Sequence, residues 1–503
     1  NGERLFQAAR FTTEMQYQHM VFEEFARRIQ PGIDPFVFTN SADIDPSIMA
    51  EFAHAVYRFG HSMLTDTVDR LDAQLMPVNG DAEQMSLIEA FLNPEAFTGS
   101  GSSLDEAQAA FIRGLTSDVG SEIDEFIVPA LRSNLLGLPL DLAALNIARA
   151  RDTGVPSLNE TRAQLYNDFG LPDLKPYASW TDFTQYLKNP FSIANFIAAY
   201  GNHASITSAT TLADKREAAT LLLFGDGTNS DGVTIRGVTY TNEDRLNFLN
   251  GRGGYGAGND RGGLDNVDLW IGGLAEKVTE FGGMLGTTFG FIFEYQMEQL
   301  QNGDRFYYLS RTQGLNLLDA LEANTFADIV MRNSALSGDY ATHINANLFL
   351  TPDMILELDR AIAQRDYNGA GAGRDPVWDD PIIQSLDPKV IRVDSGVTDA
   401  NGHQVGGELH FRGGEHVVLG GTEGDDYIKS DLGDDALWGD GGNDYLNGGA
   451  GADQVFGGDG DDIIEDTFGD NFLRGERGND VVSSSRGINL LFGGEGRDAL
   501  LVG

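Results

Sequence analysis

Two histidines and an arginine are spaced so that they share one side of a predicted helix. Apolar residues recur at intervals of three and four between Ile48 and Met63, and this period predicts an amphipathic helix. His54, Arg58 and His61 fall at i, i+4 and i+7 on another side of that helix. An imidazole beside a guanidinium suits a haem, because the iron takes an axial nitrogen and the propionates seek a cation. On spacing alone, a structural histidine is the commoner explanation.

The run Tyr57-Arg58-Phe59-Gly60-His61 resembles the proximal-histidine helix of the animal-type haem peroxidases, the peroxidase–cyclooxygenase superfamily. Three more blocks resemble that family in the same order, at residues 1–10, 140–152 and 265–276, the last with residues 303–308 downstream of it. The resemblance covers about residues 1–345. It implies a mainly α-helical domain that binds b-type haem through His61 and uses peroxide to oxidise a small reductant or a halide. The resemblance would also imply that the protein takes part in the response to oxidative stress.

The second of these blocks offers a partner for the proximal histidine. Asn146 and Arg149 lie three residues apart on the expected helix and therefore on one side of it. A haem-ligating imidazole presents its unprotonated nitrogen to iron, so its other N–H needs an acceptor. Given the resemblance, we expect Asn146 to be that acceptor for His61, which makes the two the candidate catalytic pair. Arg58 and Arg149 would hold the propionates; without the resemblance, ion pairs of both arginines with nearby aspartates would be favoured.

The distal side of the family's site has no match in this sequence. In that family a distal His and Arg, which cleave peroxide, lie upstream of the block that residues 1–10 match. Neither His19 nor His54 sits in a matching motif. We therefore expect an upstream segment to supply the distal residues if the protein is a peroxidase. The alternative is a non-catalytic extracellular structural or adhesive protein that binds calcium on a peroxidase-like scaffold.

Residues 421–501 divide into nine nonapeptides. Position four is Gly in all nine, position eight is always aliphatic, and position six is Asp except at Asn471 and Asn489. Gly permits a tight turn that exposes main-chain carbonyls, Asp adds hard anionic oxygens, and the aliphatic residue gives one inward contact per strand. The pattern resembles the calcium-binding parallel β-roll of the RTX, or haemolysin-type, secreted proteins. The expected calcium ligands are Asp426, Asp435, Asp444, Asp453, Asp462, Asp480 and Asp498.

The composition is strongly acidic. There are 76 Asp and Glu against 34 Lys and Arg, a net charge of -42, and residues 421–501 alone hold 19 acidic and 5 basic residues. This charge excludes nucleic acid and anionic membrane surfaces as partners and favours cations. Without a cation the stacked Asp side chains would repel, so we expect a chelator to unfold residues 421–503 and to leave the helices of residues 1–365 folded. Cysteine is absent, and no apolar run reaches the about 20 residues of a membrane span.

The resemblance to secreted β-rolls also implies a location. In those families low cytosolic calcium keeps the repeats unfolded during export, and millimolar external calcium folds them. We therefore expect a secreted protein, extracellular or at the cell surface, exported by a type I route in a Gram-negative bacterium. Other extracellular or cell-surface proteins are candidate partners.

The sequence predicts a multidomain chain. A haem-peroxidase-like domain spans residues 1–365 with an insertion at about 175–262, a linker and short β segment spans 366–420, and the β-roll spans 421–503. A helical pattern from Pro352 to Arg365 is expected to close the first domain. The stretch from Gly225 to Gly263, dense in Gly, Asn and Asp, is expected to be a long surface loop.

Overall fold

The chain folds into two compact units in a computed structural model. The structure describes residues 2–37, 44–78, 84–97, 103–133, 135, 138–227, 231–279, 283–312, 317–334, 336, 343–362, 364–366, 369–370 and 388–503. One unit comprises Phe25–Asp66 and Gly120–Ser310 and is called the helical unit here. The other comprises Asn1–Glu24, Thr67–Val119 and Arg311–Gly503 and is called the roll unit.

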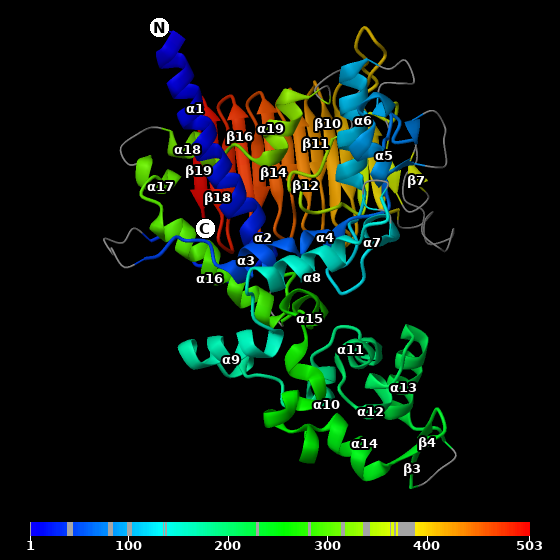
Figure 1. The fold of residues 1–503 in the computed structure, drawn as a ribbon. Coiled ribbons are helices and arrows are strands. Elements are labelled where there is room, and N and C mark those ends of the chain that lie inside the picture. Colours follow the sequence, from blue (N-terminus) through cyan, green and yellow to red (C-terminus); the bar gives the residue numbers. More distant parts are fainter. Residues whose placement is uncertain are drawn as a thin grey trace. The chain divides into compact units, whose positions relative to one another are not determined.

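Several helices of the helical unit begin at a side-chain cap. Asp141 accepts a hydrogen bond of 2.9 Å from the N–H of Ala144 at the start of one helix, and Ser157 accepts from Glu160 at the start of the next. The helices are α2 (Arg27–Ile29), α3 (Ala50–His54), α4 (Gly60–Met63), α7 (Pro129–Ser133), α8 (Leu142–Asp152), α9 (Leu158–Phe169), α10 (Trp180–Gln185), α11 (Ile193–Tyr200), α12 (Ala204–Thr207), α13 (Leu212–Phe224), α14 (Asn242–Leu249), α15 (Leu269–Ala275), α16 (Thr287–Gly303) and α17 (Tyr308–Arg311) (Figure 1).

The segment that carries His61 is three short helical pieces, so the prediction of one helix from Ile48 to Met63 is wrong. Helix α3 ends where Ala55 takes φ −128° and ψ −68°, a 3-10 turn spans Val56–Arg58, and α4 follows. Ala55 and Val56 are fully buried, and Val56 and Gly60 are weak helix formers, so the apolar period of the sequence does not by itself fix a continuous helix here. The i, i+4, i+7 alignment expected for the two histidines is therefore interrupted.

The stretch from Gly225 to Gly263 is not the surface loop that its composition predicted. Its described residues form a hairpin of β3 (Gly232–Ile235) and β4 (Val238–Thr241), followed by α14. Val233, Ile235 and Phe248 are buried. The ring of Phe248 lies 5.1 Å from the ring of His203, so buried side chains attach this segment to the rest of the helical unit.

The roll unit combines helices with a β-roll. Helices α6 and α19 each begin with a capping box, formed by Ser103 with Glu106 and by Thr325 with Asp328. They meet in a small core that contains Ala109 of α6 and Ala327 of α19. The helices of this unit are α1 (Gly2–His19), which continues as a π-helix to Ala26, α5 (Leu87–Leu92), α6 (Leu104–Ser117), α18 (Leu318–Glu322) and α19 (Phe326–Asn333), and a short pair of strands is formed by β1 (Thr67–Val68) and β2 (Met85–Ser86).

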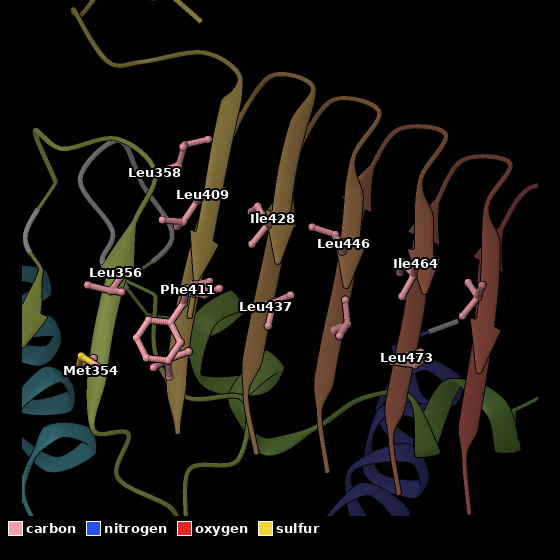
Figure 2. Close-up of a cluster of buried hydrophobic side chains, with 14 residues drawn as sticks. Met354, Leu356, Leu358, Leu409, Phe411, Ile428, Leu437, Leu446, Ile464 and Leu473 are labelled. Atoms are coloured by element: carbon pink, nitrogen blue, oxygen red, sulfur yellow. The ribbon is translucent and has the colours of Figure 1, made fainter. Parts of the chain in front are cut away.

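The repeats form the predicted parallel β-roll. Successive strands alternate between two sheets, so neighbours within a sheet lie 18 residues apart, as in the pairs Leu419 with Leu437 and Leu437 with Val455. The position-eight residues from Ile428 to Val482 point inward and are fully buried (Figure 2). The strands are β8 (Val390–Asp394), β9 (Gly407–Phe411), β10 (Val417–Thr422), β11 (Asp426–Lys429), β12 (Ala436–Asp440), β13 (Tyr445–Asn447), β14 (Gln454–Asp459), β15 (Ile463–Asp466), β16 (Phe472–Arg477), β17 (Val481–Ser484), β18 (Leu490–Glu495) and β19 (Ala499–Val502).

The roll begins before the repeats. The helix predicted from Pro352 to Arg365 is wrong, because β5 (Met354–Glu357) pairs in parallel with β10, and β6 (Arg365–Asp366) and β7 (Gly369–Ala370) extend the same sheet. Met354 and Leu356 continue the inward apolar line of the repeats (Figure 2). Burial on both faces of a strand favours a continuous apolar run, which periodicity alone cannot distinguish from a helix.

One outer face of the roll is also buried. Trp438 and Phe456 of the sheet that contains β12 and β14 stack at 4.3 Å between ring centroids, and the indole N–H of Trp438 donates to the carbonyl of Ile344 at 3.2 Å. Arg474 donates to the carbonyl of Ala323 at 2.7 Å and pairs with Asp328 of α19 at 3.0 Å. The roll therefore packs against segments that precede it in the chain, and both belong to one compact unit.

We expect Phe456→Ala to lower the free energy of unfolding of the roll unit by about 3–5 kcal/mol, the usual cost of truncating a buried Phe. Phe456 is 2% exposed. The matched control is Tyr427→Ala, whose ring stacks at 4.7 Å on Tyr445 but is 42% exposed, and we expect it to cost about 1 kcal/mol or less. Denaturant unfolding with calcium present measures both. Equal losses would contradict a buried outer face.

Candidate functional site

The structure brings three predicted site residues of the helical unit together. The amide nitrogen of Asn146 on α8 lies 2.8 Å from Nδ1 of His61 on α4, and Nη1 of Arg58 donates to Oδ1 of Asn146 at 3.2 Å. Asn146 is 1% exposed, and His61 is half-buried. The indole N–H of Trp270 on α15 donates to the carbonyl of Arg58 at 3.4 Å. Three of the blocks singled out in the sequence thus meet at one place.

The orientation of the Asn146 amide decides which nitrogen of His61 carries the proton. With the amide NH2 toward Nδ1, that ring nitrogen accepts and Nε2 is protonated. With the amide turned by 180°, its oxygen accepts from Nδ1–H and leaves Nε2 free for a metal. In this structure the bond from Arg58 favours the first orientation. Holding iron at Nε2 therefore requires the amide to turn and Arg58 to find another acceptor.

The surroundings of His61 favour the neutral form of its imidazole. Burial lowers the pKa of His61, and the positive charge of Arg58 lowers it further. A neutral ring is the form that binds a metal. Nε of Arg58 is buried and has no hydrogen-bond partner among the described residues, so this guanidinium has capacity left for an acidic group. These residues fit a haem, with His61 toward the iron and Arg58 toward a propionate.

Arg149 does not join this group. It lies on α8, one turn from Asn146, and its side chain is exposed. Of the residues that the sequence assigned to haem, the structure therefore brings together His61, Asn146 and Arg58 and leaves Arg149 at the surface.

The aspartates of the repeats form a second candidate site, in the roll unit. One oxygen of each accepts a main-chain N–H from the neighbouring coil, as Oδ1 of Asp444 accepts from Asp426 at 2.8 Å and Oδ1 of Asp462 accepts from Asp444 at 2.8 Å. The second oxygen, Oδ2, is buried without a hydrogen-bond partner in Asp435, Asp444, Asp453, Asp462 and Asp480. A buried carboxylate oxygen with no donor is an expected ligand for a hard cation.

Burial raises the pKa values of these carboxyls. The pKa of Asp426 and of Asp435 rises to about 7 and that of Asp444 to about 9. Their charged forms are therefore costly unless a cation compensates them. Within the described residues no group of three His, Asp or Glu side chains converges on one point, so a cation here would take main-chain carbonyls besides the Asp oxygens. Calcium accepts such a set.

Sequence reasoning missed one polar cluster in the roll unit. His343 is 6% exposed, and its ring lies between Glu357 Oε2 at 2.8 Å from Nδ1 and Asp440 Oδ1 at 3.1 Å from Nε2. Glu357 is fully buried. No sequence signal joins three residues so far apart in the chain.

Two family models match the chain. The one described as animal haem peroxidase matches residues 1–213 and 262–349, and the one described as RTX calcium-binding nonapeptide repeat matches residues 420–455 and 456–491. These matches confirm both resemblances that the sequence predicted. They also confirm the order of the two parts, a helical domain followed by a parallel β-roll. Among the described residues no helix is long and apolar enough to cross a bilayer.

Individual relatives are distant. The peroxidasin homolog pxn-1 of Caenorhabditis elegans is 24% identical over 364 residues, which are 70% of this chain and 22% of that protein. Peroxinectin A of Dictyostelium discoideum is 25% identical over 355 residues, 69% of this chain and 50% of that protein. The solved structure of peroxidase A from Dictyostelium discoideum has a TM-score of 0.44 and 21% identity, over 69% of this chain and 52% of that one. The match thus spans about a fifth of the first of these relatives and half of the second.

Proposed function

Because the chain belongs to the animal haem peroxidase family and carries RTX calcium-binding repeats, we propose that it is a secreted haem peroxidase with a calcium-dependent roll. The observation that carries the proposal is the contact of 2.8 Å between Asn146 and Nδ1 of His61, beside Arg58. This contact joins the two blocks that resemble the family at residues 57–61 and 140–152. A proximal ligand needs such an orienting group beside its second ring nitrogen.

Each residue has a proposed role. Haem bound here would supply the peroxide-cleaving and substrate-oxidising chemistry. Nε2 of His61 is the proposed axial ligand, and Asn146 is a positioning residue whose amide oxygen accepts the Nδ1 proton. An amide attracts that proton less than a carboxylate would, which keeps the ring nearer neutral imidazole than imidazolate. Arg58 is the proposed propionate donor through its unpaired Nε, and Arg149, exposed nearby on α8, is a second donor.

We propose that the substrates are hydrogen peroxide with a small reductant or a halide. The test is oxidation of a phenol and of bromide by the haem-loaded, full-length protein, with and without peroxide. We expect peroxide-dependent oxidation of at least one substrate in the wild type and background rates in His61→Ala. If the haem-loaded wild type oxidises neither, the non-catalytic structural or adhesive role takes its place.

Secretion is part of the same proposal and is supported by the acidic roll. A net charge of -42 and buried aspartate oxygens suit a protein that meets calcium outside the cell. Extracellular calcium-binding modules bind at about 0.1–1 mM. We propose export by a type I route in the unfolded form, with folding after release, and calcium and extracellular or cell-surface proteins as partners.

A further inference from the structure

Two arginines of the roll unit line one cavity and are left with unused hydrogen-bond donors. The cavity has a volume of about 450 Å³ and lies between helix α6, the loop of residues 70–78 and Phe97. Arg113 of α6 is 7% exposed, its Nε is buried, and its side chain has no hydrogen-bond or ion-pair partner among the described residues. Arg70 donates from Nη1 to the carbonyl of Ala96 at 3.2 Å, and its Nε is buried without a partner. Buried donors in folded proteins are rarely left without an acceptor, so these two call for one.

The backbone brings the two guanidinium groups to the same cavity. A Cβ added to Gly114 would lie 2.0 Å from the carbonyl oxygen of Asp69, so α6 touches the main chain directly beside Arg70. One turn earlier on the helix, the carbonyl of Ala110 accepts from the N–H of Leu71 at 3.0 Å. Main-chain contacts therefore hold the loop on the helix, and neither guanidinium is needed to join them.

Apolar packing fixes both walls of the cavity. Leu75, in the turn of the loop, is 4% exposed and lies in the cluster on the outer face of the roll, with Val418 and Phe456. Ala109 of α6 packs with Ala327 of α19. The cavity is therefore preformed, which lowers the cost of ordering a site around a ligand.

Burial makes the charge of Arg113 costly. It lowers the pKa of Arg113, and the negative charge of Asp72 offsets only part of this effect. The guanidinium still carries its charge at neutral pH, because an arginine is effectively always protonated there. An uncharged side chain of similar length would give a more stable fold. Arg113 is therefore better explained by a ligand than by a structural role.

The rest of the lining defines the class of ligand. Guanidinium groups bind carboxylate and phosphate oxygens through paired N–H donors. Phe97 and Ala110 supply apolar wall. The exposed carboxylates of Asp72, Asp105 and Glu106 also line the cavity and outnumber the two arginines. They repel an anion of higher charge such as phosphate, so a ligand with one negative charge and an apolar body fits this lining.

We propose that this cavity binds a small organic monocarboxylate, with the carboxylate on Arg70 and Arg113 and the apolar body along Phe97. The site shares no residue with the His61 site and does not rest on the proposed peroxidase or calcium-dependent function. Because the loop and α6 both pack on other parts of the roll unit, the bound carboxylate stabilises that unit against unfolding.

The test is calorimetric titration of the full-length protein, with calcium present, against benzoate and hexanoate. We expect at least one of them to bind once per chain with a dissociation constant below about 1 mM. Benzamide, which resembles benzoate in shape but is uncharged, is expected not to bind.

Variants assign the binding to the two arginines. Arg113→Gln and Arg70→Gln should each weaken binding by about tenfold or more, the usual worth of a hydrogen bond to a charged group. The matched control is Arg477→Gln, which removes a 68% exposed arginine of the same unit and should leave the affinity unchanged. Thermal unfolding without carboxylate gives a second readout, because Arg113→Gln removes an unpaired buried charge and should keep or raise the unfolding temperature.

Four results would overturn this assignment. One is that neither carboxylate saturates the wild type, and another is that either variant binds as the wild type does. If inorganic phosphate competes with benzoate, the restriction to monocarboxylates fails. A lower unfolding temperature in carboxylate-free Arg113→Gln would show that this guanidinium serves the fold instead.

Discussion

A calcium chelator is expected to unfold the β-roll and to loosen the helices that pack on it. Residues 421–501 hold 19 acidic and 5 basic residues, and several aspartate oxygens are buried without a donor. Without the cation, the charges of the buried aspartates are uncompensated in a low-dielectric environment. This costs several kcal/mol for each buried charge. Hydrogen exchange read by mass spectrometry with and without EGTA measures the effect. We expect residues 407–502 to lose protection together.

The packing seen here changes the expectation that all helices of residues 1–365 survive chelation. Trp438 and Arg474 of the roll bond to Ile344, Ala323 and Asp328, so the segments 317–334 and 343–349 lose a packing surface when the roll unfolds. Helices α8 and α16 belong to the other compact unit and are the internal control. Retained protection in segments 317–334 and 343–349 would contradict this coupling.

In the absence of calcium, protonation of the buried aspartates is expected to restore part of the stability of the roll. The pKa of Asp426 is raised to about 7 and that of Asp444 to about 9 by burial, whereas an unfolded Asp titrates near about 3.9. The calcium-free fold therefore binds more protons than the unfolded chain, and its stability rises as the pH falls. In EGTA the roll should be least stable above about pH 9 and should gain stability down to about pH 4. Thermal unfolding across that range tests the sign, and greater stability at high pH would contradict it.

His343→Ala is expected to lower the free energy of unfolding of the roll unit by about 3–5 kcal/mol, the usual cost of removing one partner of a buried ion pair. The buried imidazole joins Glu357 of β5 and Asp440 of β12. Removing it leaves the carboxylate of Glu357 buried without its counter-charge. Denaturant unfolding in saturating calcium measures the loss.

The control is His410→Ala, which removes a partly exposed pair with Asp431 at 3.0 Å and should cost about 1 kcal/mol or less. The pH dependence provides a second readout. Burial alone would lower the pKa of His343, but Glu357 and Asp440 outweigh it and hold that pKa well above its ordinary value. The contribution of His343 is therefore complete below about pH 6.5 and declines as the pH rises toward its folded-state pKa, by about 1.4 kcal/mol per unit. Equal losses in both variants, or a flat pH profile, would contradict this role.

The roll was predictable because the sequence repeats every nine residues. The inward Leu437, Leu446 and Leu473 and the turn glycines follow from a nine-residue pattern that fixes strand, turn and face at once. The burial of Trp438 and Phe456 on the outer face was not predictable, because it depends on which distant segment covers that face.

The same limit explains the errors in the helical regions. Met354 to Glu357 reads equally well as helix or strand, and only its partner β10 decides between them. The break at Ala55 is likewise set by tertiary packing. The pairing of His61 with Asn146 was expected from the order of family blocks, whereas the cluster around His343 and the exposure of Arg149 had no local signal.

The central claim is that His61 binds haem iron, and a haem titration of the full-length apoprotein followed by visible absorption tests it most directly. The wild type is expected to give a Soret band that saturates at one haem per chain. His61→Ala is expected to lose that band, and the control His54→Ala is expected to retain it. A saturating band of the same position and intensity in His61→Ala, or a wild type that stays colourless, would contradict the account.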